Sequence, residues 1–372
     1  MTKRTRRRLL QAASFVLAAG LLYLAFRGVD LGKIVHAFRV ADYRWLPLLV
    51  FVVIFSNVLR AWRWQVMIQA LPADTSRVTK EDVSDVTLEA SFSSTMIGYM
   101  MNYVAPRMGE FARTANMATR TNLRFSSLFG TVISERIFDM VVLGLATVSG
   151  LLVVADQLSV LQERLLDPGL SQLEGLPFGT IALVITTIAL LAGAVAVWFW
   201  RSLQREQSAV RQVWTSTLRP TLVSLRDGML TLVRSPRRGV ILGSTAIMWG
   251  GYLLMAYIPF RMLDLAAPYD IGLLDAWALM AIGALGILVP SPGGLGSYHF
   301  ITIQALVLLY DVPEAPAATY AVLTHAAQLV FYSLIGGLAL LYQGRGLSTL
   351  LPTSEESAPS RAADESVPQS TK

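Results

Sequence analysis

The chain has 372 residues, of which 54% are hydrophobic and only 15% charged, with a formal net charge of +6. Apolar runs of about 20 residues recur, each about the length that crosses a ~30 Å hydrocarbon core, so the composition predicts an all-α polytopic integral membrane protein. Because the sequence has no cysteine, it excludes disulfides, thiolate metal sites and a cysteine nucleophile.

A basic stretch at residues 1–8 precedes the first apolar run, at residues 9–26. A cleaved signal peptide would end in small residues followed by polar chain, but here the small residues at 18–20 are followed by further leucines. Lysine and arginine favour the cytoplasmic side of a span. We therefore expect an uncleaved first helix with a cytoplasmic N-terminus, the alternative being a basic tail that binds nucleic acid.

A second span at residues 45–67 ends in Arg60-Ala-Trp-Arg-Trp64. Indoles favour headgroup depth and guanidinium groups reach toward lipid phosphates, so this motif is predicted to anchor the helix at the membrane surface. The alternative is that Arg60 or Arg63 grips a lipid substrate.

Residues 86–122 are expected to form a re-entrant hairpin. The apolar stretch at 92–103 would be only roughly 18 Å long as a helix, and Pro106 and Gly109 break it before a polar helix begins. Broken backbone at membrane depth is tolerated only where protein or a water-filled cavity covers it. A full span over residues 86–105 is the alternative.

The third span, at residues 125–154, contains Glu135, Arg136 and Asp139. Glu135 lies about ten residues into the helix, which is roughly 15 Å and close to the membrane midplane. Each charge costs at least ~2.5 kcal/mol at the centre of a membrane helix, so these side chains are predicted to pair or to meet water.

The second half of the chain, like the first, is predicted to consist of spanning helices and one re-entrant hairpin. Residues 181–200, 240–263 and 317–342 are predicted spans, and residues 271–310 a second hairpin, broken at Pro290-Ser-Pro-Gly-Gly-Leu-Gly296. The connection at 155–179 is acidic and predicted to be extracytoplasmic, whereas the segment at 201–238 holds eight arginines and is predicted to be a cytoplasmic amphipathic stretch. Residues 346–372 are expected to be a disordered cytoplasmic tail.

Loops rich in lysine and arginine are expected on the cytoplasmic side of the membrane. With six spans, these loops all fall on that side only if both broken segments are re-entrant, one entering from each side. A span, a hairpin and a span then recur in opposite orientation. This is the plan of inverted-repeat transporters, whose sites lie at the midplane between the repeats. The sequence therefore predicts about six spanning helices and two oppositely oriented hairpins. The protein is expected in the cell membrane, with both termini in the cytoplasm.

The two hairpins and the third span are expected to form one site. Arg107, Arg113 and Arg136 are predicted to converge on one anion, while Glu110, Glu135 and Asp139 hold them in place when the site is empty. The alternative is a closed ion-pair cluster that only staples the helices together.

The second hairpin would contribute its turn. Gly293, Gly294 and Gly296, after Pro292, permit close backbone approach, and the N–H groups of the following helix favour a phosphate; alternatively the glycines only make the turn. His299 follows directly and titrates near neutral pH.

No catalytic constellation is found. The sequence has only three histidines, no cysteine and no HExxH or GxSxG pattern. We therefore expect neither a metal site nor a nucleophilic triad, and no cofactor. His325, in the last span, is predicted to satisfy a helix–helix hydrogen bond.

Four motifs together resemble one family: Arg60-x-x-Arg-Trp64, Val104-Ala-Pro-x-x-Gly-Glu110 with Arg113, Glu135-Arg136-x-x-Asp139 and Pro290-x-Pro-Gly-Gly-Leu-Gly296. They are similar to the membrane region of lysylphosphatidylglycerol synthases, also called the flippase-like domain family. The resemblance covers roughly residues 10–345 and implies a transmembrane domain over 9–345, opposed hairpins and lipid movement between leaflets. The chain resembles the stand-alone members of this family, which have no aminoacyltransferase domain.

This family usually has a glutamate where the chain has His299, which favours an anionic phospholipid or a polyprenyl-phosphate-linked headgroup over a lysyl lipid. The expected function is therefore lipid translocation, with that headgroup as partner and no enzymatic activity. Two alternatives remain: an accessory subunit that binds a lipid- or glycan-processing enzyme through residues 201–238, and a membrane transferase with Glu110 or Glu135 as base.

Overall fold

The computed structural model describes residues 3–71, 85–105, 108–155, 237–289 and 291–344. All regular elements in these ranges are helical, and no strand occurs among them. The predicted span at 181–200, nearly all of the arginine-rich segment at 201–238 and the tail at 346–372 lie outside the described residues. The elements are α1 (Lys3–Phe26), α2 (Leu31–Val40), η1 (Tyr43–Trp45), α3 (Leu46–Gln69), α5 (Leu88–Val104), α6 (Gly109–Ala118), α7 (Phe125–Val153), α13 (Arg238–Met262), α14 (Leu273–Leu288), η5 (Pro292–Gly294), α15 (Ser297–Tyr310) and α16 (Glu314–Tyr342).

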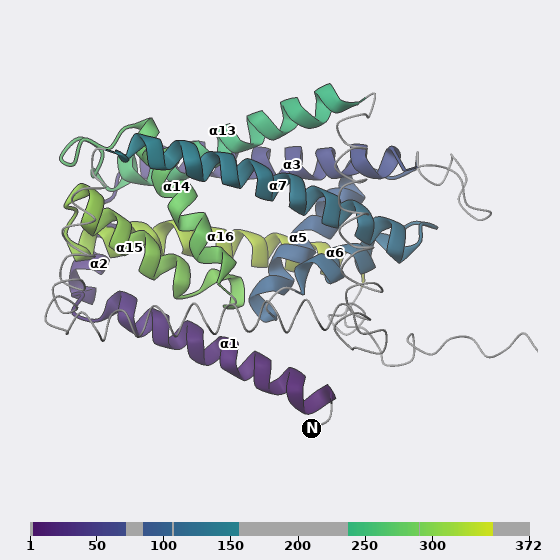
Figure 1. Ribbon diagram of the computed structural model, residues 1–372, viewed down its shortest axis with the longest axis horizontal. Coiled ribbons are helices and arrows are strands. Elements are labelled where there is room, and N and C mark those ends of the chain that lie inside the picture. Colours follow the sequence, from purple (N-terminus) through teal and green to yellow (C-terminus); the bar gives the residue numbers. More distant parts are fainter. Residues whose placement is uncertain (1–2, 72–84, 106–107, 156–236, 290, 345–372) are drawn as a thin grey trace, which may run out of the picture.

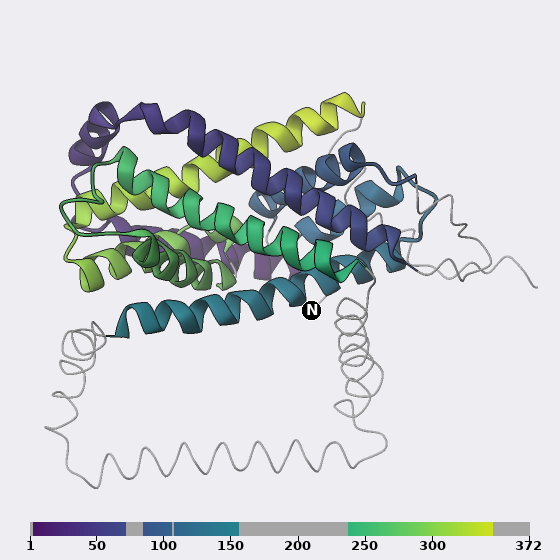
Figure 2. The same cartoon turned by 90° about the horizontal axis from the view of Figure 1, so that it is seen from above.

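The long helices run lengthwise through the molecule (Figure 1), and α3 lies beside α13 along most of its length (Figure 2). Four segments are long and apolar enough to cross a membrane, and they coincide with four predicted spans: Tyr43–Gln69, Phe125–Val153, Arg238–Met262 and Glu314–Tyr342. The first predicted span corresponds to α1, which bends by 78° into α2. The prediction of an all-α polytopic membrane protein is confirmed.

Local sequence explains where several helices begin. The Asp30 carboxylate accepts a hydrogen bond from Gly32 N at 2.8 Å and caps α2, and the Thr87 hydroxyl does the same for α5 through Ala90 N at 3.1 Å. The preceding helix α15 ends at Tyr310, where Asp311 adopts the left-handed conformation with a φ of 51°, and α16 then begins after Pro313. Such caps satisfy backbone N–H groups that have no partner within the helix.

The first hairpin consists of α5 and α6, packed closely against each other. A Cβ built on Gly98 would lie 2.8 Å from the Gly109 carbonyl oxygen, so only glycine allows the two helices to approach this far. The Asn102 side-chain oxygen accepts a hydrogen bond from Gly109 N at 2.8 Å. Asn102 therefore caps α6 from the other arm of the hairpin, and the break between the arms is held by a specific contact.

The second hairpin consists of α14, the η5 turn and α15. Three glycines make the turn, with φ angles of 57° at Gly293, 79° at Gly294 and 82° at Gly296, in the region that residues with a Cβ rarely adopt. Above the turn, a Cβ on Gly286 would lie 3.0 Å from the Ser297 carbonyl oxygen, so the arms are again packed through a glycine.

The hairpins extend inward from opposite ends of the molecule, and their tips meet in its middle (Figure 1). At the meeting point the Tyr103 ring of α5 lies so close to Gly293 that a Cβ on Gly293 would collide with it. The prediction of two oppositely oriented hairpins is thus confirmed.

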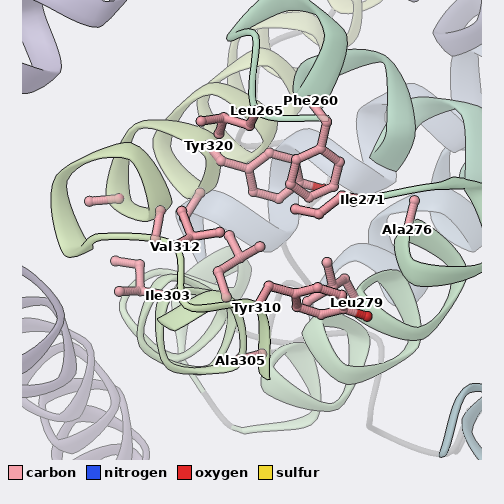
Figure 3. Close-up of a cluster of buried hydrophobic side chains, with 14 of the residues drawn as sticks. Phe260, Leu265, Ile271, Ala276, Leu279, Ile303, Ala305, Tyr310, Val312 and Tyr320 are labelled. Carbon is pink, nitrogen blue, oxygen red and sulfur yellow. The ribbon is translucent and has the colours of Figure 1, made fainter. Parts of the chain in front are cut away.

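An apolar core fixes the second hairpin in place (Figure 3). Tyr320 of α16 stacks on Phe260 of α13, with ring centroids 4.0 Å apart, and its hydroxyl donates to the Ala256 carbonyl oxygen at 2.8 Å. Leu279 of α14 and Leu306 of α15 are buried in the same cluster. Because α13, α14, α15 and α16 all contribute, this core holds the base of the second hairpin, where α14 begins and α15 ends.

Candidate functional site

Five charged side chains from three helices meet in the interior of the bundle. Arg60 and Arg63 come from α3, Arg113 from α6, and Glu135 and Asp139 from α7. The four residues other than Asp139 are at most 5% exposed, and the Asp139 side chain is 14% exposed. Spacings of three and four residues on a helix place each pair on one face, which is why α3 and α7 can present their charges to each other.

Arg60 touches both carboxylates. Its Nε lies 3.0 Å from Glu135 Oε1, and its Nη2 lies 2.5 Å from Asp139 Oδ2. Its Nη1 donates to the Tyr252 hydroxyl at 2.9 Å, which adds α13 to the cluster.

Arg63 makes a parallel set of contacts. Its Nη2 lies 2.7 Å from Asp139 Oδ1 and 3.3 Å from Glu135 Oε1, while its Nη1 donates to the Thr245 hydroxyl at 2.9 Å. Thr245 and Tyr252 are seven residues apart on α13, which is two helical turns. The face of α13 that packs on α3 therefore contributes two hydroxyl groups to the cluster.

Arg113 brings the first hairpin to the cluster. Its Nη2 lies 2.9 Å from Glu135 Oε2, and its guanidinium carbon lies 3.8 Å from the centre of the Trp64 ring. Trp64 is fully buried and its indole N–H donates to the Thr131 hydroxyl at 3.0 Å. The hairpin, α3 and α7 are thus joined through a single arginine.

The prediction that the motif Arg60-Ala-Trp-Arg-Trp64 anchors α3 at the membrane surface is wrong. Arg60, Arg63 and Trp64 share one helical face and point inward, and only Trp62 is exposed, at 38%. The alternation of arginine and tryptophan suggested a position at the membrane surface. The helical period instead puts Arg60, Arg63 and Trp64 on the inner side of α3 and Trp62 on the outer side. Arg63, which the sequence offered only as an alternative to Arg60 for gripping a lipid, is as much part of the cluster as Arg60. Its spacing from Arg60, matched to that of Glu135 and Asp139, is the signal that could have found it.

Arg136 lies outside this cluster. Its Nε is 3.1 Å from Glu110 Oε1, and the side chains of Arg136 and Glu110 are 34% and 27% exposed. The expected convergence of Arg107, Arg113 and Arg136 is therefore not seen: Arg113 and Arg136 pair with different carboxylates, and Arg107 lies outside the described residues. The sequence neighbours Glu135 and Arg136 face two different environments, one buried and one half-exposed.

The glycine turn of the second hairpin is filled by protein. Pro292 and Gly294 are buried, Gly293 packs on Tyr103, and a Cβ on Gly296 would collide with the backbone carbonyl of Ala18 in α1. Close backbone approach was predicted here and is present, but the approaching groups are Tyr103 and α1. The interpretation as a packed turn accounts for these contacts.

His299 and His325 form a second buried polar pair beside that turn. Their Nδ1 atoms lie 3.4 Å apart, and His325 Nε2 lies 3.0 Å from the Gly293 carbonyl oxygen. His325 thus makes the interhelical hydrogen bond that the sequence predicted for it, joining α16 to the second hairpin.

The charge of the five-residue cluster is its main chemical feature. Three guanidinium groups face two carboxylates, so one positive charge is left uncompensated within it. Guanidinium groups bind phosphate and carboxylate oxygens through paired N–H donors. Among the described residues there is no group of three histidine, aspartate or glutamate side chains that could hold a metal ion.

The fold and the cluster define a class: a multi-pass α-helical membrane protein with two opposed hairpins and a buried charged site between its helices. The chain belongs to the family described as the lysylphosphatidylglycerol synthase TM region, whose model matches residues 11–336. No curated protein and no solved structure matches the chain. Membership of this family places the protein among membrane proteins of lipid handling.

Proposed function

We propose that this protein translocates a lipid between leaflets, binding an anionic headgroup, either a phospholipid phosphodiester or a polyprenyl-phosphate linkage. The observation that carries the proposal is the uncompensated guanidinium charge of the buried cluster, which a single phosphodiester anion would neutralise. The family assignment supports the same substrate class.

A purely structural role explains the cluster less well. Removing charges from water costs several kcal/mol per ion, and a buried ion pair is often no more stabilising than the apolar residues that could replace it. Three arginines against two carboxylates are a still poorer way to hold helices together, because two negative charges cannot neutralise three positive ones. An anionic ligand would supply the missing negative charge.

The half-exposed pair Arg136–Glu110 gives the headgroup a first contact. It lies on α7 and α6, which also carry Glu135 and Arg113 of the buried cluster, and the Arg136 side chain is 34% exposed. In the proposed cycle, phosphate exchanges with Glu110 on Arg136, passes to the buried arginines past Asp139, and crosses while the acyl or prenyl tails stay in lipid. No covalent step is included.

The proposal places the protein in the cell membrane with both termini in the cytoplasm, as supported by the basic residues 1–8. The sequence has no nucleotide-binding motif, so the direction of transport would follow a lipid or ion gradient or a partner protein.

The test is translocation of a fluorescent anionic phospholipid in proteoliposomes. We expect Arg136→Gln and Asp139→Asn each to lower the rate at least tenfold. Arg44→Gln is the matched control, because Arg44 pairs with Asp42 at 2.9 Å but its side chain is 90% exposed. Unchanged translocation in both site variants would reject the site. If function is instead lost only when the arginines of residues 201–238 are neutralised, the protein is an accessory subunit.

A further inference from the structure

The buried histidine pair lies where three parts of the molecule meet. His299 is in the first turn of α15, directly after the glycine turn, and His325 is in α16; each is 6% exposed, and their ring centroids are 4.8 Å apart. The Phe26 ring of α1 packs on His299, with centroids 5.8 Å apart. The charged cluster of α3, α6 and α7 includes neither histidine.

The hydrogen bonds fix the tautomers of the neutral pair. The Gly293 carbonyl can only accept, so the proton on His325 must be on Nε2. His325 Nδ1 then carries a lone pair and accepts from His299 Nδ1, which must carry the proton of that ring. The remaining lone pair is on His299 Nε2, to which no described residue donates.

This arrangement has room for one additional proton. A proton added to His299 Nε2 leaves both hydrogen bonds in place and makes the bond between the rings charge-assisted. A second proton would have to go to His325 Nδ1, where two N–H donors would then face each other. The pair can therefore accept one additional proton, whereas a second one would break the hydrogen bond between the two rings.

None of the residues that the structure describes offers the added charge a counterion. Among them, the titratable groups that face the pair are two tyrosines: Tyr298 of α15, with its ring centroid 5.5 Å from that of His325, and Tyr103 of α5, at 6.2 Å. No aspartate, glutamate, lysine or arginine in the described part of the chain contacts either imidazole. A charge buried without a partner is costly, so the protonated state is suited to a transient step rather than to the resting protein.

The pair is also mechanically connected to the meeting point of the hairpins. The Gly293 carbonyl, which accepts from His325, belongs to the residue that packs on Tyr103 of the first hairpin. Strengthening of the bond between the rings on protonation would thus be passed through His325 to the Gly293 carbonyl, at the contact between the two tips.

We propose that His299 and His325 form a proton-binding site that couples lipid translocation to a proton gradient, with one proton bound per cycle. The coupling rests on the proposed function. The proton passes from water to His299 Nε2 and leaves on the opposite side of the membrane.

Coupling is tested by the leaflet distribution of the lipid at equilibrium. If one proton moves per lipid, a gradient of one pH unit should change the ratio of lipid between leaflets about tenfold. His299→Gln and His325→Gln should abolish this accumulation, and glutamine at 325 can still donate to the Gly293 carbonyl. His36→Gln is the control, because His36 is exposed on α2 and should leave the accumulation intact.

A second measurement separates failure of the coupling from failure of the proposed function. In His36→Gln protein, ¹⁵N NMR of the two remaining histidines should show the Nδ1–H tautomer for His299 and the Nε2–H tautomer for His325, with uptake of one proton shared by the pair. Independent titration of two ordinary imidazoles would overturn the site. Lipid exchange that is intact at equal pH but unaffected by a pH gradient would overturn the coupling alone. Absence of any exchange would reject the proposed function, and the histidine titration would still decide whether the pair binds one proton.

Discussion

The guanidinium carbon of Arg113 lies over the Trp64 ring, 3.8 Å from its centre, while its Nη2 lies 2.9 Å from Glu135 Oε2. A cation over a desolvated indole is worth about 2 kcal/mol or more. Arg113 is therefore held in position by the ring as well as by the carboxylate. This allows Glu135 to be shared with Arg60 and Arg63, and it attaches the first hairpin to α3 by a contact that does not depend on the carboxylate.

The first prediction concerns the carboxylate at the centre of the cluster. Glu135→Gln leaves three guanidinium groups facing only Asp139, and breaking a buried pair in this way typically costs about 3–5 kcal/mol. We expect a lower melting temperature in detergent micelles, measured by tryptophan fluorescence. Asp42→Asn, which breaks the exposed pair with Arg44, should leave the melting temperature unchanged.

A second substitution at the cluster checks the charge argument itself. Arg113→Gln in the Glu135→Gln background removes one surplus guanidinium, so the double variant should be more stable than Glu135→Gln alone. A double variant that is less stable by the sum of both single effects would show that Arg113 and Glu135 do not interact.

The third prediction uses two adjacent glycines of α16. A Cβ on Gly336 would lie 2.7 Å from the Met96 carbonyl oxygen of α5, whereas a Cβ on Gly337 meets nothing within 4 Å. Gly336→Ala should therefore destabilise the protein by about 1–3 kcal/mol through overpacking. Gly337→Ala should be neutral or stabilising by up to about 1 kcal/mol, because alanine is the better helix former. Equal melting temperatures for the two variants would contradict the close packing of α5 on α16.

The fourth prediction tests the contact between the hairpin tips. Gly293→Ala introduces a Cβ at a φ of 57° and against the Tyr103 ring, so it should destabilise the protein and disturb translocation. Adding Tyr103→Ala should restore part of the loss, since it removes the ring but not the backbone strain. If Tyr103→Ala gives no recovery, the tips do not meet through these two residues.

The sequence predicted those features of the fold that are encoded locally. Apolar runs gave the spans over residues 45–67 and 317–342, and the proline and glycine breaks gave both hairpins, because each signal lies within one segment. The helix lengths and the opposed arrangement followed from the same runs and from the distribution of lysine and arginine.

The candidate site was only partly predictable, because its geometry depends on how helices far apart in the sequence are rotated against each other. Arg60 lies 79 residues from Asp139 in the chain, so the residues around Arg60 do not show which carboxylates it contacts. Arg136 was expected beside Arg113, yet one step along α7 turns it from the buried cluster to Glu110. Likewise, Gly336 and Gly337 are indistinguishable in the sequence, and only the position of α5 separates them.

The last prediction concerns the hydrogen bond that joins the two arms of the first hairpin where the chain turns from α5 to α6. Asn102 on α5 accepts a hydrogen bond from Gly109 N, the first residue of α6, at 2.8 Å. Asn102→Ala should cost about 0.5–2 kcal/mol, as the loss of a helix N-cap usually does, and Asn102→Asp should retain most of the stability because a carboxylate is an equally good acceptor. Because α6 carries Arg113, loss of the cap should also weaken the contact between Arg113 and Glu135, seen as a smaller coupling energy between them in a double-mutant cycle. Asp30→Ala removes the cap of α2, which is remote from the cluster, and should leave that coupling energy unchanged. An equal loss of coupling in both cap variants would mean that Asn102 acts through general stability rather than by positioning α6.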